Sequence, residues 1–192
     1  ADIRFSPALS GQTVVLTSGQ LLSSLRTRIL AGSLPAGIRI SGNNTGRILQ
    51  VATGNAVVLE SVHLTHGLSA QGGGAILVDQ TAALELHRCS ITGCSTTDRG
   101  GGIYFVKGSS LLLSGTTVSG CTARNGGGVY FYGLGGKVMR CDDSTFSGNT
   151  ATGFGGGVYV NNGQASTFVN TTIHGNQAGQ DGGGIDTGGN AS

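Results

Sequence analysis

The stretch Gly148–Val160, GNTATGFGGGVYV, places three consecutive glycines directly before a short apolar run. Glycine loses more backbone entropy on folding than any other residue, so a triplet weakens the element that contains it. The triplet nevertheless recurs, beginning at Gly72, Gly100, Gly126, Gly155 and Gly182. The steps between triplets are 28, 26, 29 and 27 residues, which indicates a repeat architecture.

A second motif repeats with the same period. It reads ITGC, VSGC, FSGN and IHGN, and it ends at Cys94, Cys121, Asn149 and Asn176. Its steps are 27, 28 and 27 residues, so two independent markers share one repeat length. An earlier ISGN, ending at Asn43, indicates that the pattern starts before the first glycine triplet.

Alignment on these markers predicts columns of side chains that are buried together. One column holds Leu86, Leu113, Cys141 and Phe168, and a second holds Ile91, Val118, Phe146 and Ile173. After the triplets, the residues predicted to point inward are Ala75/Leu77, Ile103/Phe105, Val129/Phe131 and Val158/Val160. The residues between them, predicted to point outward, are Ile76, Tyr104, Tyr130 and Tyr159. Alternation with a period of two over such short runs indicates strands.

A repeat of about 27 residues with only short strands cannot bury a core alone, but stacked copies can form a parallel solenoid. We therefore predict an all-β fold, a single-stranded parallel β-helix of about seven coils of roughly 27 residues. The glycines would supply the positive φ or close approach that each sharp corner needs. We expect one domain over 1–192, with irregular N-terminal coils and a cap in 1–45 and regular GGG-marked coils in 46–192.

Composition excludes several other classes of protein. Charged residues make up only 10% of the chain and the formal net charge is +2, so the sequence shows no cluster of basic residues of the kind that binds nucleic acid. No apolar run is long enough for a transmembrane helix. Flexible linkers would not hold neighbouring apolar columns in phase, and calcium-binding rolls need repeats of about nine residues with aspartate in each.

The motifs GGGIYF, GGGVYF and GGGVYV, each preceded by a [IVF]-x-G-[CN] motif, resemble the GGA[ILV] and FxxN repeats of polymorphic outer-membrane proteins and related autotransporter-type parallel β-helix proteins. The segments IRFSPALSGQTVVLTSGQLL and IRISGNNTGRILQV resemble N-terminal coils of bacterial surface β-helices of pectate-lyase-like topology. The resemblance implies a right-handed β-helix that is secreted or located at the cell surface. The chain departs from the family in using GGG where the family has GGA, and it shows no β-barrel translocator or sorting tail.

An enzymatic alternative follows from the same resemblance, because pectate-lyase-like helices include polysaccharide lyases and glycoside hydrolases. Such chemistry needs carboxylates that converge on one face. Asp142 and Asp143 have no acidic partner in the aligned positions of neighbouring repeats, and Glu60 aligns with His87 as a pair that suits a surface ion pair. We therefore favour a non-enzymatic module. We expect no cofactor and no metal site, since no single column contains His63, His66, His87 and His174.

The most distinctive outward feature is aromatic. Tyr104, Tyr130 and Tyr159 are predicted to stack on successive coils with Tyr132 nearby, as a flat amphipathic strip. Such a strip can bind carbohydrate or a surface protein, or it can simply stabilise the sheet by packing between neighbours. An ice-binding threonine array is disfavoured, because Thr65 and Thr92 are followed in their column by serine and histidine.

Three further expectations concern single columns. Cys94 and Cys121 should be stacked either as buried thiols or as a disulfide, whereas Cys89 and Cys141 are too far apart to bridge. Asn149 and Asn176 should turn inward and bond corner backbone groups. After the last triplet only IDTGGNAS remains, so we expect an open C-terminal coil to associate as a homodimer.

Overall fold

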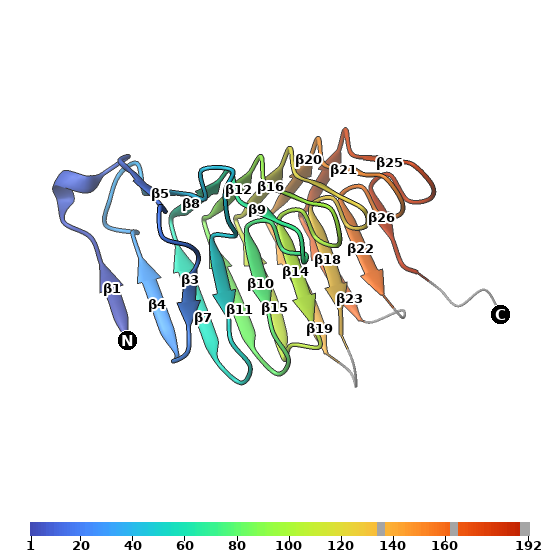
Figure 1. The fold of residues 1–192 in the computed structure, drawn as a ribbon. Helices are drawn as coiled ribbons and strands as arrows, with labels where there is room; N and C mark the ends of the chain where they lie inside the picture. Colours follow the sequence, from blue (N-terminus) through green and yellow to red (C-terminus); the bar gives the residue numbers. More distant parts are fainter. Residues whose placement is uncertain (134–136, 162–164, 189–192) are drawn as a thin grey trace.

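The computed structural model describes residues 1–133, 137–161 and 165–188, and these wind into seven coils stacked along one axis (Figure 1). Three sheets of seven strands and one of five run along the stack, with successive coils as hydrogen-bonded neighbours. The fold is a right-handed, all-β parallel β-helix, as predicted. The described residues include a short 3₁₀ helix, η1 (Pro7–Leu9), and no helix long and apolar enough to cross a membrane.

Two of the sheets form the first part of every coil. Sheet A consists of β1 (Asp2–Arg4), β4 (Thr27–Leu30), β7 (Ala56–Glu60), β11 (Ala83–His87), β15 (Ser110–Ser114), β19 (Val138–Asp142) and β23 (Ser166–Val169). Sheet B consists of β2 (Thr13–Val15), β5 (Ile38–Ser41), β8 (Val62–Thr65), β12 (Ser90–Thr92), β16 (Thr117–Ser119), β20 (Thr145–Ser147) and β24 (Thr172–His174).

The other two sheets close the coil. Sheet C consists of β3 (Leu21–Ser23), β6 (Leu49–Val51), β10 (Ile76–Val78), β14 (Ile103–Val106), β18 (Val129–Tyr132), β22 (Val158–Asn161) and β26 (Ile185–Asp186). Sheet D, which lies between sheets B and C in the chain, consists of β9 (Leu68–Ser69), β13 (Ser95–Thr96), β17 (Thr122–Ala123), β21 (Thr150–Ala151) and β25 (Gln177–Ala178).

The core is built from the predicted columns. In sheet A, the Leu86 column pairs residue by residue through Leu113 and Cys141 to Phe168. In sheet B, the Ile91 column pairs in the same way through to Ile173. The inward aromatic rings also stack on each other, with the centroids of Phe105 and Phe131 4.7 Å apart. Both predicted columns are therefore confirmed.

The prediction around the first triplet is wrong by one residue. Ile76 pairs with Ile103 and Leu77 with Tyr104, so Ile76 is buried and Leu77 faces outward. The cause is the corner, where Gly73 donates a hydrogen bond to the Arg99 carbonyl at 2.9 Å, the position that Gly100 takes one coil later. The corner of this coil therefore reads Gly-Gly-Ala, with Gly72 as an extra residue before it.

Residues 1–45 are more regular than predicted. β1, β2 and β3 form a first coil in register with the second, and β4 and β5 begin that second coil, whereas sheet D starts only with β9 in the third coil. In the predicted cap region, η1 leaves apolar side chains of the first coil exposed, and among the described residues nothing covers them. These side chains are Ile3, Leu9, Val14, Val15, Leu21, Leu22 and Leu25.

The first two glycines of a corner triplet are required for different steric reasons. The first member has positive φ, as at Gly126 with 63°, a conformation that glycine adopts without a Cβ clash. The second member faces the backbone of the next coil, and a Cβ on Gly127 would lie 2.6 Å from the Thr150 carbonyl oxygen. The glycine of the second motif also has positive φ, 60° at Gly148, but its surroundings are open.

Alanine substitutions should separate these two reasons. We expect Gly127→Ala to lower the free energy of unfolding by about 3 kcal/mol, because fixed backbone cannot make room for the methyl group. Gly148→Ala should cost only about 1 kcal/mol, the penalty of a left-handed backbone conformation. Urea denaturation followed by circular dichroism measures both values. Equal losses would contradict the proposed close contact between coils.

The cysteines and asparagines that end the second motif share one column, which is buried at Cys94, Cys121 and Asn149 and half-buried at Asn176. All four cysteines of the chain are free and buried, so the disulfide alternative for Cys94 and Cys121 is not the one adopted. Burial raises the pKa of the Cys89 thiol to about 11 and that of Cys141 to about 12. A hydrogen bond with Cys94, together with burial, raises the pKa of the Cys121 thiol.

The asparagines continue this column with a chain of hydrogen bonds. The Asn149 amide donates to the Val118 carbonyl at 2.9 Å, and its oxygen accepts from the Cys121 backbone N–H at 3.0 Å. Asn176 repeats the pattern one coil later, donating to the Phe146 carbonyl and accepting from the Asn149 N–H, each at 2.9 Å. The predicted inward orientation is confirmed, and each amide satisfies corner groups that strand pairing leaves free.

Removing one buried amide should therefore show how much the column contributes to the free energy of unfolding. We expect Asn149→Ala to lower the free energy of unfolding by about 1–3 kcal/mol, because it leaves backbone groups of Val118 and Cys121 unpaired. Asn55→Ala is the control, since that amide makes an exposed 3.2 Å bond within its own turn. Matching urea midpoints for the two variants would count against this role.

Candidate functional site

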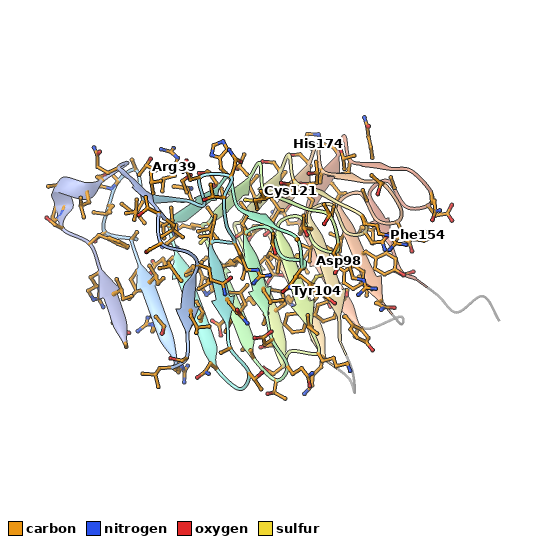
Figure 2. All side chains as sticks on the ribbon, viewed as in Figure 1. Arg39, Asp98, Tyr104, Cys121, Phe154 and His174 are labelled. Carbon is orange, nitrogen blue, oxygen red and sulfur yellow. The ribbon has the colours of Figure 1, made fainter. Side chains whose placement is uncertain are left out.

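The predicted tyrosine strip lies on the outward face of sheet C, where Tyr104 projects from β14 (Figure 2). Tyr104 pairs with Tyr130 and Tyr130 with Tyr159, so the three residues do occupy one column. The three rings do not form the flat strip that was predicted, because they differ in orientation. The Tyr104 and Tyr130 rings meet edge to face at 5.4 Å, whereas those of Tyr130 and Tyr159 stack at 4.9 Å.

Tyr130 is enclosed by its neighbours and is only 5% exposed. The Arg99 guanidinium lies over its ring at 5.4 Å, and the Asn161 amide donates to its hydroxyl at 3.0 Å. Burial raises the pKa of Tyr130 to about 12. Tyr104 and Tyr159 remain half-exposed on either side, so they provide the accessible part of the strip.

Tyr132 belongs to the neighbouring outward column, beside Asn161 and Val106. Its ring is half-exposed, and the Lys107 ammonium lies 5.5 Å from its centroid. Phe154 extends the aromatic surface at the corner, with its ring 6.2 Å from that of Tyr159. The outward face of sheet C thus presents aromatic rings bordered by an amide, an ammonium and a guanidinium.

The enclosure of Tyr130 predicts a mainly structural role for this residue. Tyr130→Ala should lower the free energy of unfolding by about 3 kcal/mol, as expected for loss of a large packed aromatic side chain. Tyr132→Ala should cost about 1 kcal/mol, because that ring mainly loses an exposed cation–π contact. Chemical denaturation compares the two variants, and a smaller loss for Tyr130→Ala than for Tyr132→Ala would refute the packing role.

A second candidate site lies on the outward face of sheet A. A groove of about 420 Å³ crosses β4, β7 and β11, with Leu30 and Val58 among its apolar lining. Its charged lining consists of Arg26, Arg28, Glu60, Glu85, His87 and Arg88. Sequence alignment placed Glu60 beside His87, and the register confirms this. It did not reveal the arginines, because Arg26 and Arg88 lie outside the strands.

Each carboxylate on this face has its own nearby partner. Glu60 forms an ion pair with Arg88, and Glu85 lies 3.4 Å from the His87 ring nitrogen. Further along the sheet, the Arg140 guanidinium donates to Asp142 at 2.6 Å. The predicted Glu60–His87 ion pair is therefore replaced by two separate pairs.

The remaining candidates of the sequence do not form a further site. Asp143 accepts a hydrogen bond from the Asn170 amide at 2.6 Å, and it makes no contact with a second carboxylate among the described residues. In the described part of the chain, no group of three or more His, Cys, Asp or Glu side chains could hold a metal ion. The corner charges Asp98 and Arg99 form only a loose pair, at 3.9 Å.

Comparison with known proteins identifies the class of the fold. Residues 35–192, most of the chain, match the family described as right handed beta helix region. The chain therefore belongs to the right-handed β-helix family. Searches among curated proteins and among solved structures gave no match.

Proposed function

We propose that the protein is a non-enzymatic, exported or cell-surface β-helix module that adheres to carbohydrate through the tyrosine strip. The observation that carries the proposal is the outward face of sheet C, where half-exposed Tyr104, Tyr159 and Tyr132 surround the buried Tyr130. Rings held rigidly in one column can stack on sugar rings with little loss of entropy. The neighbouring amide of Asn161 can bond sugar hydroxyls.

Location at a bacterial surface is supported by the likeness of the GGG motifs to polymorphic outer-membrane and autotransporter-type repeats. The partnered carboxylates on sheet A support a binding role over hydrolysis, because Glu60 and Asp142 are each held in an ion pair with an arginine. Self-association through the C-terminal coil, in which Phe168 and Ile173 are half-buried, remains a prediction. Residues 189–192 of the predicted tail lie outside the described residues.

A glycan array tests the proposal directly. We expect wild-type protein to bind a subset of glycans, and Tyr159→Ala to weaken binding about tenfold by loss of one stacking ring. Val138→Ala, an exposed change on sheet A, serves as the control and should bind normally. Binding that survives both Tyr104→Ala and Tyr159→Ala would refute the assignment to this strip. Capture of surface proteins without any glycan signal would instead indicate a protein partner.

A polysaccharide lyase or glycoside hydrolase is the second candidate, favoured by the presence of Glu60, Glu85 and His87 in one groove. Its test is turnover of uronic-acid polymers with and without calcium. Turnover that is lost in Glu85→Gln would establish this alternative and overturn the non-enzymatic proposal. Asp142→Asn, on the same sheet outside the groove, is the matched control.

A further inference from the structure

The outward face of sheet B carries a serine and a histidine that contact each other directly. His63 lies on β8 and Ser90 on β12, and the two residues are register partners in neighbouring coils. In Figure 2 this face forms the edge that carries the labelled Arg39 and His174, toward opposite ends of the sheet. The distance from Nδ1 of His63 to Oγ of Ser90 is 2.8 Å, and both side chains are half-buried. At this distance a histidine can take the proton of a serine hydroxyl.

The preceding coil leaves space for the His63 ring and fixes its orientation. Gly37 has a φ of 61°, and a Cβ there would lie 2.8 Å from Nε2 of His63. The backbone of Ala36 forms a hydrogen bond with the ring. The N–H of Ala36 already donates to Ser10 Oγ at 3.1 Å, so the bond to the ring uses the Ala36 carbonyl. Because a carbonyl can only accept, Nε2 carries the ring proton and Nδ1 accepts from the Ser90 hydroxyl.

The surroundings of His63 also keep its imidazole neutral. Burial lowers the pKa of His63 below its ordinary value, the charge of Arg39 lowers it further, and the hydrogen bond to Ala36 only partly opposes these two effects. A neutral imidazole can accept a proton, whereas an imidazolium cannot. Ser90, His63 and the Ala36 carbonyl therefore have the arrangement of a nucleophile, its base and a group that orients the base.

A second serine and histidine on the same sheet show that strand pairing alone does not create this contact. Ser147 and His174 are also register partners, on β20 and β24. No hydrogen bond joins their side chains in the described part of the chain, and His174 is exposed. The later members of the Ser90 column are threonines without a histidine partner, namely Thr117, Thr145 and Thr172. Among the described residues of sheet B, only Ser90 has this geometry.

We infer that Ser90 is a nucleophile that takes an acyl group from a carboxylic ester, with His63 as its base. Oγ of Ser90 attacks the carbonyl carbon of the ester while the hydroxyl proton passes to Nδ1 of His63. The bond between the carbonyl carbon and the alcohol oxygen of the ester then breaks, and the leaving alcohol takes the proton from His63. The products are an acyl ester of Ser90 and a free alcohol, and the imidazole returns to its neutral form.

Two neighbours in the column can stabilise the negative charge that the carbonyl oxygen acquires during the attack. Arg39 precedes His63 in the column, and Thr117 follows Ser90. A guanidinium and a hydroxyl are both able to donate to an oxyanion. The transfer acylates the protein itself, so it goes beyond the glycan binding proposed for sheet C and uses a different face of the molecule.

Mass spectrometry of the whole chain treated with p-nitrophenyl acetate tests this inference. We expect one acetyl group on Ser90, located by peptide mapping, and release of a matching amount of nitrophenolate. Ser90→Ala should abolish this acetylation. His63→Phe should slow it about a hundredfold, because a ring of similar size remains and the base is lost. Ser147→Ala is the matched control and should react at the wild-type rate.

Circular dichroism separates a loss of reaction from a loss of fold. Ser90→Ala should melt near the wild-type midpoint, because it removes only an outward hydroxyl, and this variant is sufficient for the test if His63→Phe does not fold. Wild-type protein without acetyl on Ser90, an unchanged rate in His63→Phe, or equal acetylation of Ser147 would overturn the inference. The glycan array tests sheet C with other variants, so failure of one experiment leaves the result of the other standing.

Discussion

The parallel hydrogen bonds between successive coils are the interaction on which the whole structure depends. Because each strand pairs only with its equivalent in the coils before and after it, every position of the repeat becomes a column. A residue type that suits one coil then suits the next, which places Leu86 over Leu113 and Tyr104 beside Tyr130. Glycine is required at the corners because backbone from the neighbouring coil occupies the space that a side chain would fill, as at Gly127.

The period, the strands and most columns could be predicted from the sequence, since two motifs recur with one spacing. The error at Ile76 arose because the repeats were aligned on the first glycine of each triplet. The hydrogen bonds between coils show that the corner there consists of Gly73, Gly74 and Ala75, one residue later than the triplet. The enclosure of Tyr130 could not be predicted, because it depends on where the Arg99 side chain turns. Arg26 and Arg88 of the groove were missed because they lie outside the strands, although the alignment of Arg88 with Gly115 was a visible signal.

The two candidate surfaces depend on the sequence repeat in different ways. The tyrosine strip depends on the repeat itself, because aromatic residues stand at one position in successive coils and support each other. The groove on sheet A depends on one departure from the repeat, since the turn position of Arg88 holds Ser61, Gly115, Asp143 and Asn170 in the other coils from β7 onward. Arg28 and Glu60 share their columns with Arg140 and Asp142.

The single-file stacking of coils has an evolutionary consequence. A duplicated or deleted repeat unit, if it joins in phase, moves everything beyond it along the axis by about one strand spacing and leaves each column intact. The separation between the groove, on β4 to β11, and the strip, on β14 to β22, can therefore change only in such steps. The number of coils between the two surfaces therefore fixes their axial distance, and recombination between repeat units can change that distance without altering either surface.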